Sequence, residues 1–252
     1  MYLGIDLGSR TIKVCFLSED GEISFEVVES GYDPLKQALE LIQKYPTKHI
    51  VATGYGRHLL KEHLSCEVIT EIKAHALGVR HFFPEARTII DIGGQDSKVI
   101  SLDNEGRVAH FLMNEKCAAG TGRFLEIMAM SLGFKISEFG ERALQGRGEV
   151  KISSMCTVFA ESEVISLKNR GVNPLEIARA VHQSVVDKIL AMVHRVGVEE
   201  KVVFTGGVAK NMAIAMLLQE ALGLEILIPL HPEITGALGC ALYAQFSNKM
   251  IP

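Results

Sequence analysis

Apolar positions along the chain switch between the spacing of strands and the spacing of helices. Three short apolar runs, separated by turn signals, open the sequence, and the same arrangement returns from Thr88 onward. Short runs bounded by Gly, Asp and Asn predict strands joined by tight turns. Most of the remaining chain has apolar residues three and four positions apart, which predicts amphipathic helices.

These patterns predict an α/β fold in which each half begins with hairpin strands. Further strands are expected over 49–53, 66–69, 201–205 and 225–228, and helices over 35–45, 71–82, 120–132, 136–144, 158–169, 174–196, from the Gly206-Gly207 turn to 222, and 232–246. We therefore expect two related subdomains with mixed sheets. Subdomain I spans 1–84 and subdomain II spans 85–252, with the C-terminal helix free to pack back on subdomain I.

One short segment occurs twice. Asp6–Val14 and Asp91–Val99 both read Asp, an apolar residue, Gly, four further residues, Lys and Val. Each copy follows one apolar run and leads into another, so each predicts a tight turn between two strands. A single Gly-containing turn would be ordinary. Two copies in matched context predict two half-molecules that close on one nucleotide.

The first copy has the residues of a phosphate turn. Gly8 lets the backbone turn sharply and lets a phosphate approach, because it has no side chain. Backbone N–H groups of the next three residues are candidate phosphate donors, and the strand lysine is a candidate positive charge. Asp6, at the end of a strand, is a candidate for holding Mg²⁺ through water. The expected nucleotide-binding residues of this copy are Gly8, Ser9, Arg10, Thr11 and Lys13.

The second copy and a later Gly-Gly turn complete the candidate site. Gln95 is a candidate for orienting the attacking water, and Asp91 is a candidate catalytic carboxylate. The later turn follows the predicted strand 201–205, and we expect it to accept the adenosine of the nucleotide. The binding residues expected in these two turns are Gly93, Gly94, Gln95, Asp96, Gly206, Gly207, Val208 and Ala209.

Composition narrows the class of protein. Apolar residues make up 48% of the 252 residues and charged residues 22%, with a formal net charge of -4. A negative chain without clustered Lys and Arg argues against nucleic acid as a partner. No apolar stretch reaches the roughly 20 residues that a membrane span needs. Because a strand is predicted almost from the first residue, we expect no signal peptide and a cytoplasmic protein.

Two of the five cysteines stand out by their position. None forms a Cys-x-x-Cys pair, and an odd number in such a chain does not indicate a disulfide framework. Cys15, Cys66 and Cys240 lie in apolar patterns and are expected to pack as small hydrophobic residues. Cys117 and Cys156 each precede a predicted helix, whose N-terminal end stabilises a thiolate.

The motifs resemble those of a known family. The two Asp-x-Gly turns and the Gly-Gly turn are similar to the phosphate and adenosine motifs of the superfamily of sugar kinases, actin and heat-shock chaperone ATPases. Thr53–Arg57, Cys117–Arg123 and the segment around Cys156 further resemble the activator, component A, of 2-hydroxyacyl-CoA dehydratases and the ATPase subunits of benzoyl-CoA reductase. The resemblance covers essentially the whole chain. It implies an actin-like fold that binds ATP or ADP and Mg²⁺ in a cleft between the subdomains.

The same resemblance implies an anaerobic electron-transfer function. A [4Fe-4S] cluster takes four thiolates, and one chain offers Cys117 and Cys156, so a homodimer would share one cluster. The expected electron donor is ferredoxin or flavodoxin. The expected acceptor is an iron-sulfur dehydratase or a related double-cluster reductase.

Two other functions fit the nucleotide turns alone. A small-molecule kinase of the same fold would need an acceptor pocket and a catalytic carboxylate, for which Asp91 or Asp96 is available. A nucleotide-gated binding module without redox function would need no cluster. ATP consumption that depends on an acceptor favours the kinase, and a colourless, iron-free, ATP-binding dimer favours the module.

Overall fold

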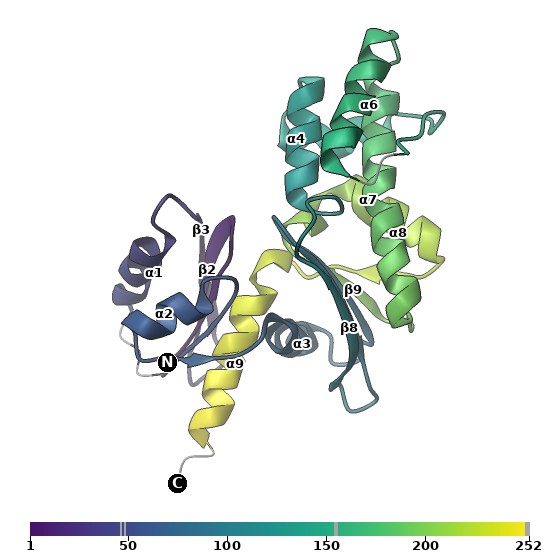
Figure 1. Cartoon of the computed structure of the whole chain (residues 1–252). Coiled ribbons are helices and arrows are strands. Elements are labelled where there is room, and N and C mark those ends of the chain that lie inside the picture. The colour runs from purple at the N-terminus through teal and green to yellow at the C-terminus, as the bar shows by residue number, and fades with distance from the viewer. Residues whose placement is uncertain (46, 48, 154–155, 250–252) are drawn as a thin grey trace. The chain divides into compact units, whose positions relative to one another are not determined.

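The protein is described by a computed structural model over residues 1–45, 47, 49–153 and 156–249 (Figure 1). The chain divides into two compact units. Unit 1 comprises Met1–Ala86, Leu102–Ala109 and the described residues from Pro229 on, and unit 2 comprises Arg87–Ser101 and His110–Ile228. The residues from Pro229 on cluster with unit 1, a placement that the expected division left open for the C-terminal helix.

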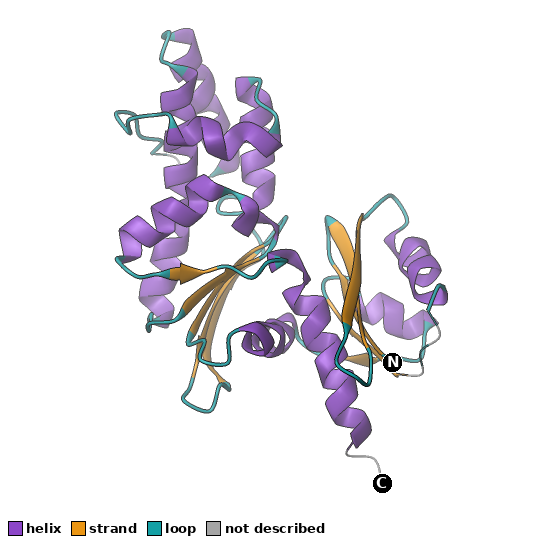
Figure 2. Ribbon diagram, turned by 180° about the vertical axis from the view of Figure 1, so that it is seen from behind, coloured by secondary structure: helices purple, strands orange, loops and turns teal. Residues whose placement is uncertain are grey.

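Unit 1 contains a five-stranded sheet in the order β3-β2-β1-β4-β5. Helices cover both faces of that sheet, as Figure 2 shows, with α1 and α2 on one face and α9 on the other, where α3 packs against α9. The strands are β1 (Tyr2–Leu7), β2 (Thr11–Leu17), β3 (Ile23–Glu29), β4 (His49–Thr53) and β5 (Glu67–Val68). The helices are α1 (Pro34–Gln43), α2 (Arg57–His63), α3 (Glu71–Phe82), the short η2 (Pro232–Ile234) and α9 (Thr235–Lys249).

Unit 2 contains a second five-stranded sheet, in the order β10-β9-β6-β7-β8. Its strands are β6 (Thr88–Ile92), β7 (Ser97–Leu102), β8 (Val108–Asn114), β9 (Val202–Thr205) and β10 (Ile226–Leu227), and the tip of the β7–β8 hairpin belongs to unit 1. Its helices are α4 (Gly122–Leu132), α5 (Ile136–Leu144), α6 (Thr157–Asn169), α7 (Pro174–Val196), the short η1 (Gly207–Lys210) and α8 (Met212–Leu222).

The two sheets have the same topology, which confirms the predicted fold of two related subdomains. In unit 1, β1 pairs antiparallel with β2 and parallel with β4. In unit 2, β6 pairs antiparallel with β7 and parallel with β9. Both sheets are therefore mixed, and in each the strand before the repeated turn occupies the central position.

Buried apolar residues explain why α9 belongs to unit 1. Its small and apolar side chains pack with residues of β1, β2 and α3 in one core cluster, which contains Tyr2, Cys15, Ala74, Ala237, Leu238, Cys240 and Ala241. Alternating small residues give a helix a flat face that fits closely on a sheet. Burial raises the pKa of the Cys15 thiol to about 12 and that of Cys240 well above its ordinary value. Both thiols therefore behave as the predicted packing residues, whereas Cys66 is only partly buried.

Most predicted elements are confirmed, with three differences. Helix α2 was not expected: it begins after Gly56 with no side-chain cap and buries only Leu60. The predicted helix after the Gly206-Gly207 turn is interrupted, because η1 ends at Lys210 before α8 begins. Strands β5 and β10 are both shorter than predicted. Among the helices that the structure describes, none is long and apolar enough to cross a membrane.

Candidate functional site

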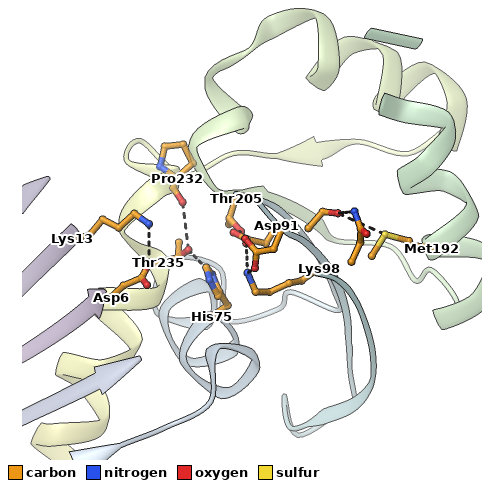
Figure 3. A network of polar contacts seen from close by, with 12 residues as sticks. Asp6, Lys13, His75, Asp91, Lys98, Met192, Thr205, Pro232 and Thr235 are labelled. Carbon is orange, nitrogen blue, oxygen red and sulfur yellow. Dashed lines mark hydrogen bonds and ion pairs between the residues drawn. The ribbon is translucent and has the colours of Figure 1, made fainter. Parts of the chain in front are cut away.

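The repeated turns place an aspartate and a lysine side by side in both units. Asp6 is paired in register with Lys13, and Asp91 with Lys98. The ammonium nitrogen of Lys13 lies 2.9 Å from Oδ2 of Asp6. The equivalent distance from Lys98 to Asp91 is 3.2 Å (Figure 3). Each lysine therefore forms an ion pair with the aspartate of its own turn.

Asp91 has hydrogen-bond partners on both carboxylate oxygens. Thr205 Oγ1 donates to Oδ1 at 2.8 Å, and Lys98 contacts Oδ2. The side chain of Asp91 is only 3% exposed. A carboxylate held on both oxygens and buried is better placed to organise the site than to accept a proton from a substrate.

Some of the other predicted phosphate residues lie at the exposed tip of each turn. Ser9 and Arg10 are exposed, and the backbone of Arg10 accepts a hydrogen bond of 2.9 Å from Ser30. In unit 2, Gln95 is exposed at the tip, and Gly93 N donates to Asp96 O at 2.9 Å to close the turn. The tips are therefore available to a ligand, and Gln95 is reachable by water.

The Gly-Gly turn follows β9 and is shaped by a close backbone approach. Gly206 has a φ of 85°, and a Cβ on it would lie 2.3 Å from the carbonyl oxygen of Ile92. Val208 and Ala209 are buried, whereas Gly207 is exposed. Of the four predicted adenosine residues, only Gly207 thus has an exposed surface.

Unit 1 contains a counterpart of the Gly-Gly turn. This counterpart was not recognised in the sequence as part of the repeat. Thr53 is paired with Asp6, just as Thr205 is paired with Asp91. Gly54, which follows, has a φ of 90°, and a Cβ on it would lie 2.5 Å from Oδ1 of Asp6. The duplication therefore includes a third segment. Its sequence signal is a Thr-Gly pair after an apolar run, which was visible but short.

The second turn is joined directly to α4. Gly122 N donates to Gly93 O at 2.9 Å, and Arg123 N donates to Gly94 O at 2.8 Å. A Cβ on Gly122 would lie 3.1 Å from Gly93 O and 3.3 Å from a methyl group of Val208. The start of α4 therefore meets both the second turn and the Gly-Gly turn, so closely that a side chain at Gly122 would need its neighbours to shift by a few tenths of an ångström.

Cys117 lies in the loop between β8 and α4. Asn114 organises this loop, because its amide donates to the carbonyl oxygens of Cys117 and Ala119 at 2.9 Å each, and contacts Ser97 Oγ at 3.5 Å. The helix begins only at Gly122, and its first two amides bond the second turn. These two amides are therefore already paired with backbone carbonyl groups of the second turn.

Cys156 occupies the N-cap position of α6 and is exposed, as the sequence predicted for a thiol at a helix start. Ser154 and Met155, which belong to the same motif, lie outside the described residues. Val158 and Phe159, which follow Thr157 in the first turn of α6, are 68% and 67% exposed. An exposed thiol beside exposed apolar side chains is typical of a surface that is covered in an assembly.

Two carboxylates accept hydrogen bonds from the segment that precedes Cys156. Glu176 accepts hydrogen bonds from the backbone of residues 147–149, at 2.6, 3.0 and 3.1 Å. These bonds hold the pKa of Glu176 below its ordinary value. Glu163 accepts from Ser153 N at 3.1 Å and from its hydroxyl at 3.2 Å. Nothing in the sequence indicates these hydrogen bonds.

Within the part of the chain that the structure describes, no group of three or more His, Cys, Asp or Glu side chains could hold a metal ion. The two cysteines of the motif therefore do not meet a third ligand of these types in one chain. Their chemistry still fits an iron-sulfur cluster, since Cys156 is exposed and Cys117 is only partly buried.

Comparison with known proteins places the chain in a family. The sequence profile of the BadF/BadG/BcrA/BcrD ATPase family matches residues 3–244. The chain belongs to this ATPase family. The 2-hydroxyisocaproyl-CoA dehydratase activator of Clostridioides difficile is 43% identical over 251 residues, 96% of this chain and 94% of that protein.

Two solved structures are similar to this protein over nearly the whole chain. The crystal structure of (R)-2-hydroxyglutaryl-CoA dehydratase component A from Acidaminococcus fermentans gives a TM-score of 0.90 at 40% identity and covers 98% of both chains. The activator of the 2-hydroxyisocaproyl-CoA dehydratase from Clostridium difficile, with bound ADPNP, gives 0.90 at 42% identity, covering 100% of this chain and 98% of that one. The predicted family and actin-like ATPase fold are thereby confirmed.

Proposed function

We propose that this ATPase is an activator that uses ATP hydrolysis to deliver a low-potential electron to an iron-sulfur enzyme. The observation that carries the proposal is the pair of hydrogen bonds from Gly122 and Arg123 to the second turn. They join a predicted phosphate turn to the helix that follows Cys117. A change of nucleotide at the turn would therefore act on the segment that carries a candidate cluster ligand.

The nucleotide-binding part of the proposal uses the three turns. The exposed tips that contain Arg10 and Gln95 would contact the phosphates, and the backbone at Gly207 would approach the adenosine. Asp6 would hold Mg²⁺ through water, since this ion keeps most of its hydration shell. Gln95 would orient the attacking water, so that the products are ADP and phosphate.

The redox part of the proposal uses Cys117 and Cys156. Two chains would supply four thiolates to one [4Fe-4S] cluster on the two-fold axis of a homodimer. When bound, such a cluster accepts and donates one electron at a time. The exposed Val158 and Phe159 beside Cys156 are the kind of surface that such a dimer would cover.

The partners are proposed from the relatives. The similar proteins named above are an activator and a component of 2-hydroxyacyl-CoA dehydratases, so we propose an iron-sulfur dehydratase, or a related double-cluster reductase, as the electron acceptor. A ferredoxin or flavodoxin would supply the electron.

The test is anaerobic purification, with iron and sulfide counted per dimer and a visible spectrum recorded with and without ATP. We expect one cluster per dimer, lost in Cys117→Ser and in Cys156→Ser. Cys66→Ser is the matched control, because Cys66 is also partly buried but lies in unit 1, outside the cysteine motifs. A Cys117→Ser protein that still holds a full cluster contradicts the ligand assignment, and an iron-free wild-type dimer contradicts electron transfer.

A further inference from the structure

The loop that carries Cys117 is held by hydrogen bonds to its carbonyl groups. The side-chain amide of Asn114 lies 2.9 Å from the carbonyl oxygen of Cys117 and 2.9 Å from that of Ala119. Because both partners are acceptors, the atom that faces them must be Nδ2, which has two hydrogens to donate. The carbonyl oxygen between them, on Ala118, accepts from Thr121 Oγ1 at 2.6 Å and from Thr121 N at 3.1 Å. Three successive carbonyl groups of the loop are therefore bound.

The amides of the same loop have no such partners. Among the described residues, none accepts a hydrogen bond from the backbone N–H of Ala118, Ala119 or Gly120. Ala119 is only 6% exposed, and Gly120 is buried. Buried N–H groups in folded proteins are nearly always paired, with protein, water or a ligand. The loop therefore has donors available for an acceptor that the described residues do not supply.

Asn114 fixes the direction of two of these amides. The C=O and N–H groups of a trans peptide point in opposite directions, and no peptide among the described residues is cis. The carbonyl groups of Cys117 and Ala119 point at Asn114. The N–H groups of the same two peptides, on Ala118 and Gly120, therefore point away from it.

The turn at Gly120 depends on the same side chain. Gly120 has a φ of 82°, and Thr121 N donates back to Ala118 O, a pattern typical of a type II turn with glycine in its third position. Type I and type II turns differ by a rotation of the middle peptide, whose carbonyl group here belongs to Ala119. The bond from Asn114 to that carbonyl group therefore selects the direction of the Gly120 N–H.

The start of α4 cannot replace these donors, because the amides of Gly122 and Arg123 are bonded to the second turn. The loop amides, which directly follow Cys117, are therefore the donors available beside it. Sulfur atoms of an iron-sulfur cluster accept hydrogen bonds, and such bonds are among the factors that set its reduction potential. A donor favours the reduced state, because that state carries one more negative charge.

We propose that Asn114 is a positioning residue that directs the amides of Ala118 and Gly120 at sulfur, and thereby raises the reduction potential of the cluster bound at Cys117. This inference rests on the proposed function and adds to it a residue that determines how readily the cluster accepts its electron. Asn114 acts through the backbone of the loop, since both of its hydrogens are engaged by carbonyl groups.

The test is a mediated redox titration of the anaerobically purified protein, followed by electron paramagnetic resonance of the reduced cluster. Wild type is compared with Asn114→Ala, which removes both donors, and with Asn114→Gln, which retains a side-chain amide. Ser97→Ala is the matched control, because Ser97 contacts the same amide at only 3.5 Å and lies outside the loop. Iron and sulfide counts establish that each protein holds a cluster.

We expect Asn114→Ala to make reduction of the cluster less favourable by about tenfold, the scale of one hydrogen bond to a charged group. For one electron this is a shift of about 59 mV to more negative potential. Asn114→Gln should recover part of the shift, and Ser97→Ala should keep the wild-type potential. Electron-nuclear double resonance of reduced wild type should detect coupled protons that exchange in D₂O, and their coupling should weaken in Asn114→Ala.

Three results overturn the inference and leave the proposed function intact. In the first, Asn114→Ala holds a cluster with the wild-type potential. In the second, Ser97→Ala shifts the potential as much as Asn114→Ala does. In the third, no exchangeable proton couples to the wild-type cluster, a measurement that needs no variant. If Asn114→Ala assembles no cluster, Asn114→Gln carries the comparison. A wild-type protein without a cluster would overturn both the inference and the proposed electron transfer.

Discussion

Protonation of one buried histidine should control the acid stability of unit 2. His182, on α7, is completely buried, and its ring packs against Phe139 at 4.6 Å between centroids. Its Nδ1 lies 2.8 Å from the carbonyl oxygen of Ala178, so Nδ1 must donate. Nε2 must then accept, and it lies 3.0 Å from the side-chain amide of Asn211.

Asn211 cannot reverse its amide without a loss elsewhere. Its oxygen caps α8 by accepting from Ala213 N at 3.0 Å and Ile214 N at 3.2 Å. A proton on Nε2 of His182 would face the amide hydrogens of Asn211. Either the contact between His182 and Asn211 breaks, or the amide turns and α8 loses its N-cap. Loss of an N-cap lowers stability by about 1 kcal/mol. The network is therefore complete only while His182 is neutral.

The magnitude follows from the pKa. Burial lowers the pKa of His182 from 6.5 to about 4, against the opposing effect of its hydrogen bond to Ala178. The unfolded chain therefore binds a proton between these values while the folded protein does not, so stability falls as pH falls below 6.5. At about 1.4 kcal/mol per unit, the full loss is about 3 kcal/mol, of which about 2 kcal/mol appears between pH 7 and pH 5.

The assay is urea unfolding, followed by circular dichroism, of wild type and His182→Gln from pH 7 to pH 5. Glutamine can donate and accept hydrogen bonds but does not titrate, so the difference between the proteins isolates the histidine. We expect wild type to lose about 2 kcal/mol relative to the variant over this range. A flat difference, or an NMR titration of His182 near pH 6.5 in the folded protein, would refute the reasoning.

Three further predictions concern the contact of α4 with the second turn, the segment before Cys156, and the reactivity of the cysteines. In Gly122→Ala, the added methyl group would press against the second turn. We therefore expect ATP to raise the midpoint temperature of unfolding by less than it does in wild type. An equal rise would show that this contact does not couple the turn to α4. Glu163→Gln weakens the hydrogen bonds to Ser153, so the visible absorbance of the proposed cluster should bleach faster in air than in wild type, and equal rates would contradict that role. In cluster-free protein, Cys156 should react rapidly with a thiol reagent and Cys15 only on unfolding, as mass spectrometry of labelled peptides would show.

The sequence was most informative where a local pattern determines a local structure. The repeat of Asp, Gly and Lys predicted the two hairpins, because strand periodicity and a glycine turn fix the register within a few residues. Helix α7 was predicted with correct bounds, since Asn173 caps it and Pro174 begins it. Helix α2 escaped prediction, because it has neither a capping side chain nor an extended apolar face.

Contacts between distant segments could not be predicted. The bonds from Gly122 and Arg123 to the second turn join residues far apart in sequence, and nothing in either segment indicates the other. The roles of Glu163 and Glu176 as acceptors for a loop depend on how α6 and α7 pack. The pairing of each repeat lysine with an aspartate could not be predicted either, because the sequence gives the charge of a side chain but not its nearest partner.

The matching strand order and Asp–Lys register of the two sheets are most simply explained by duplication and fusion of one ancestral gene. In a dimer of identical halves, every substitution in the turn would appear in both copies. Fusion removes that constraint, and Thr11 and Asp96 are where the descendants of one position have diverged. Variants with Asp at both positions, or Thr at both, would restore the symmetry of the two turns. Comparing how such variants bind nucleotide would show what each substitution changed.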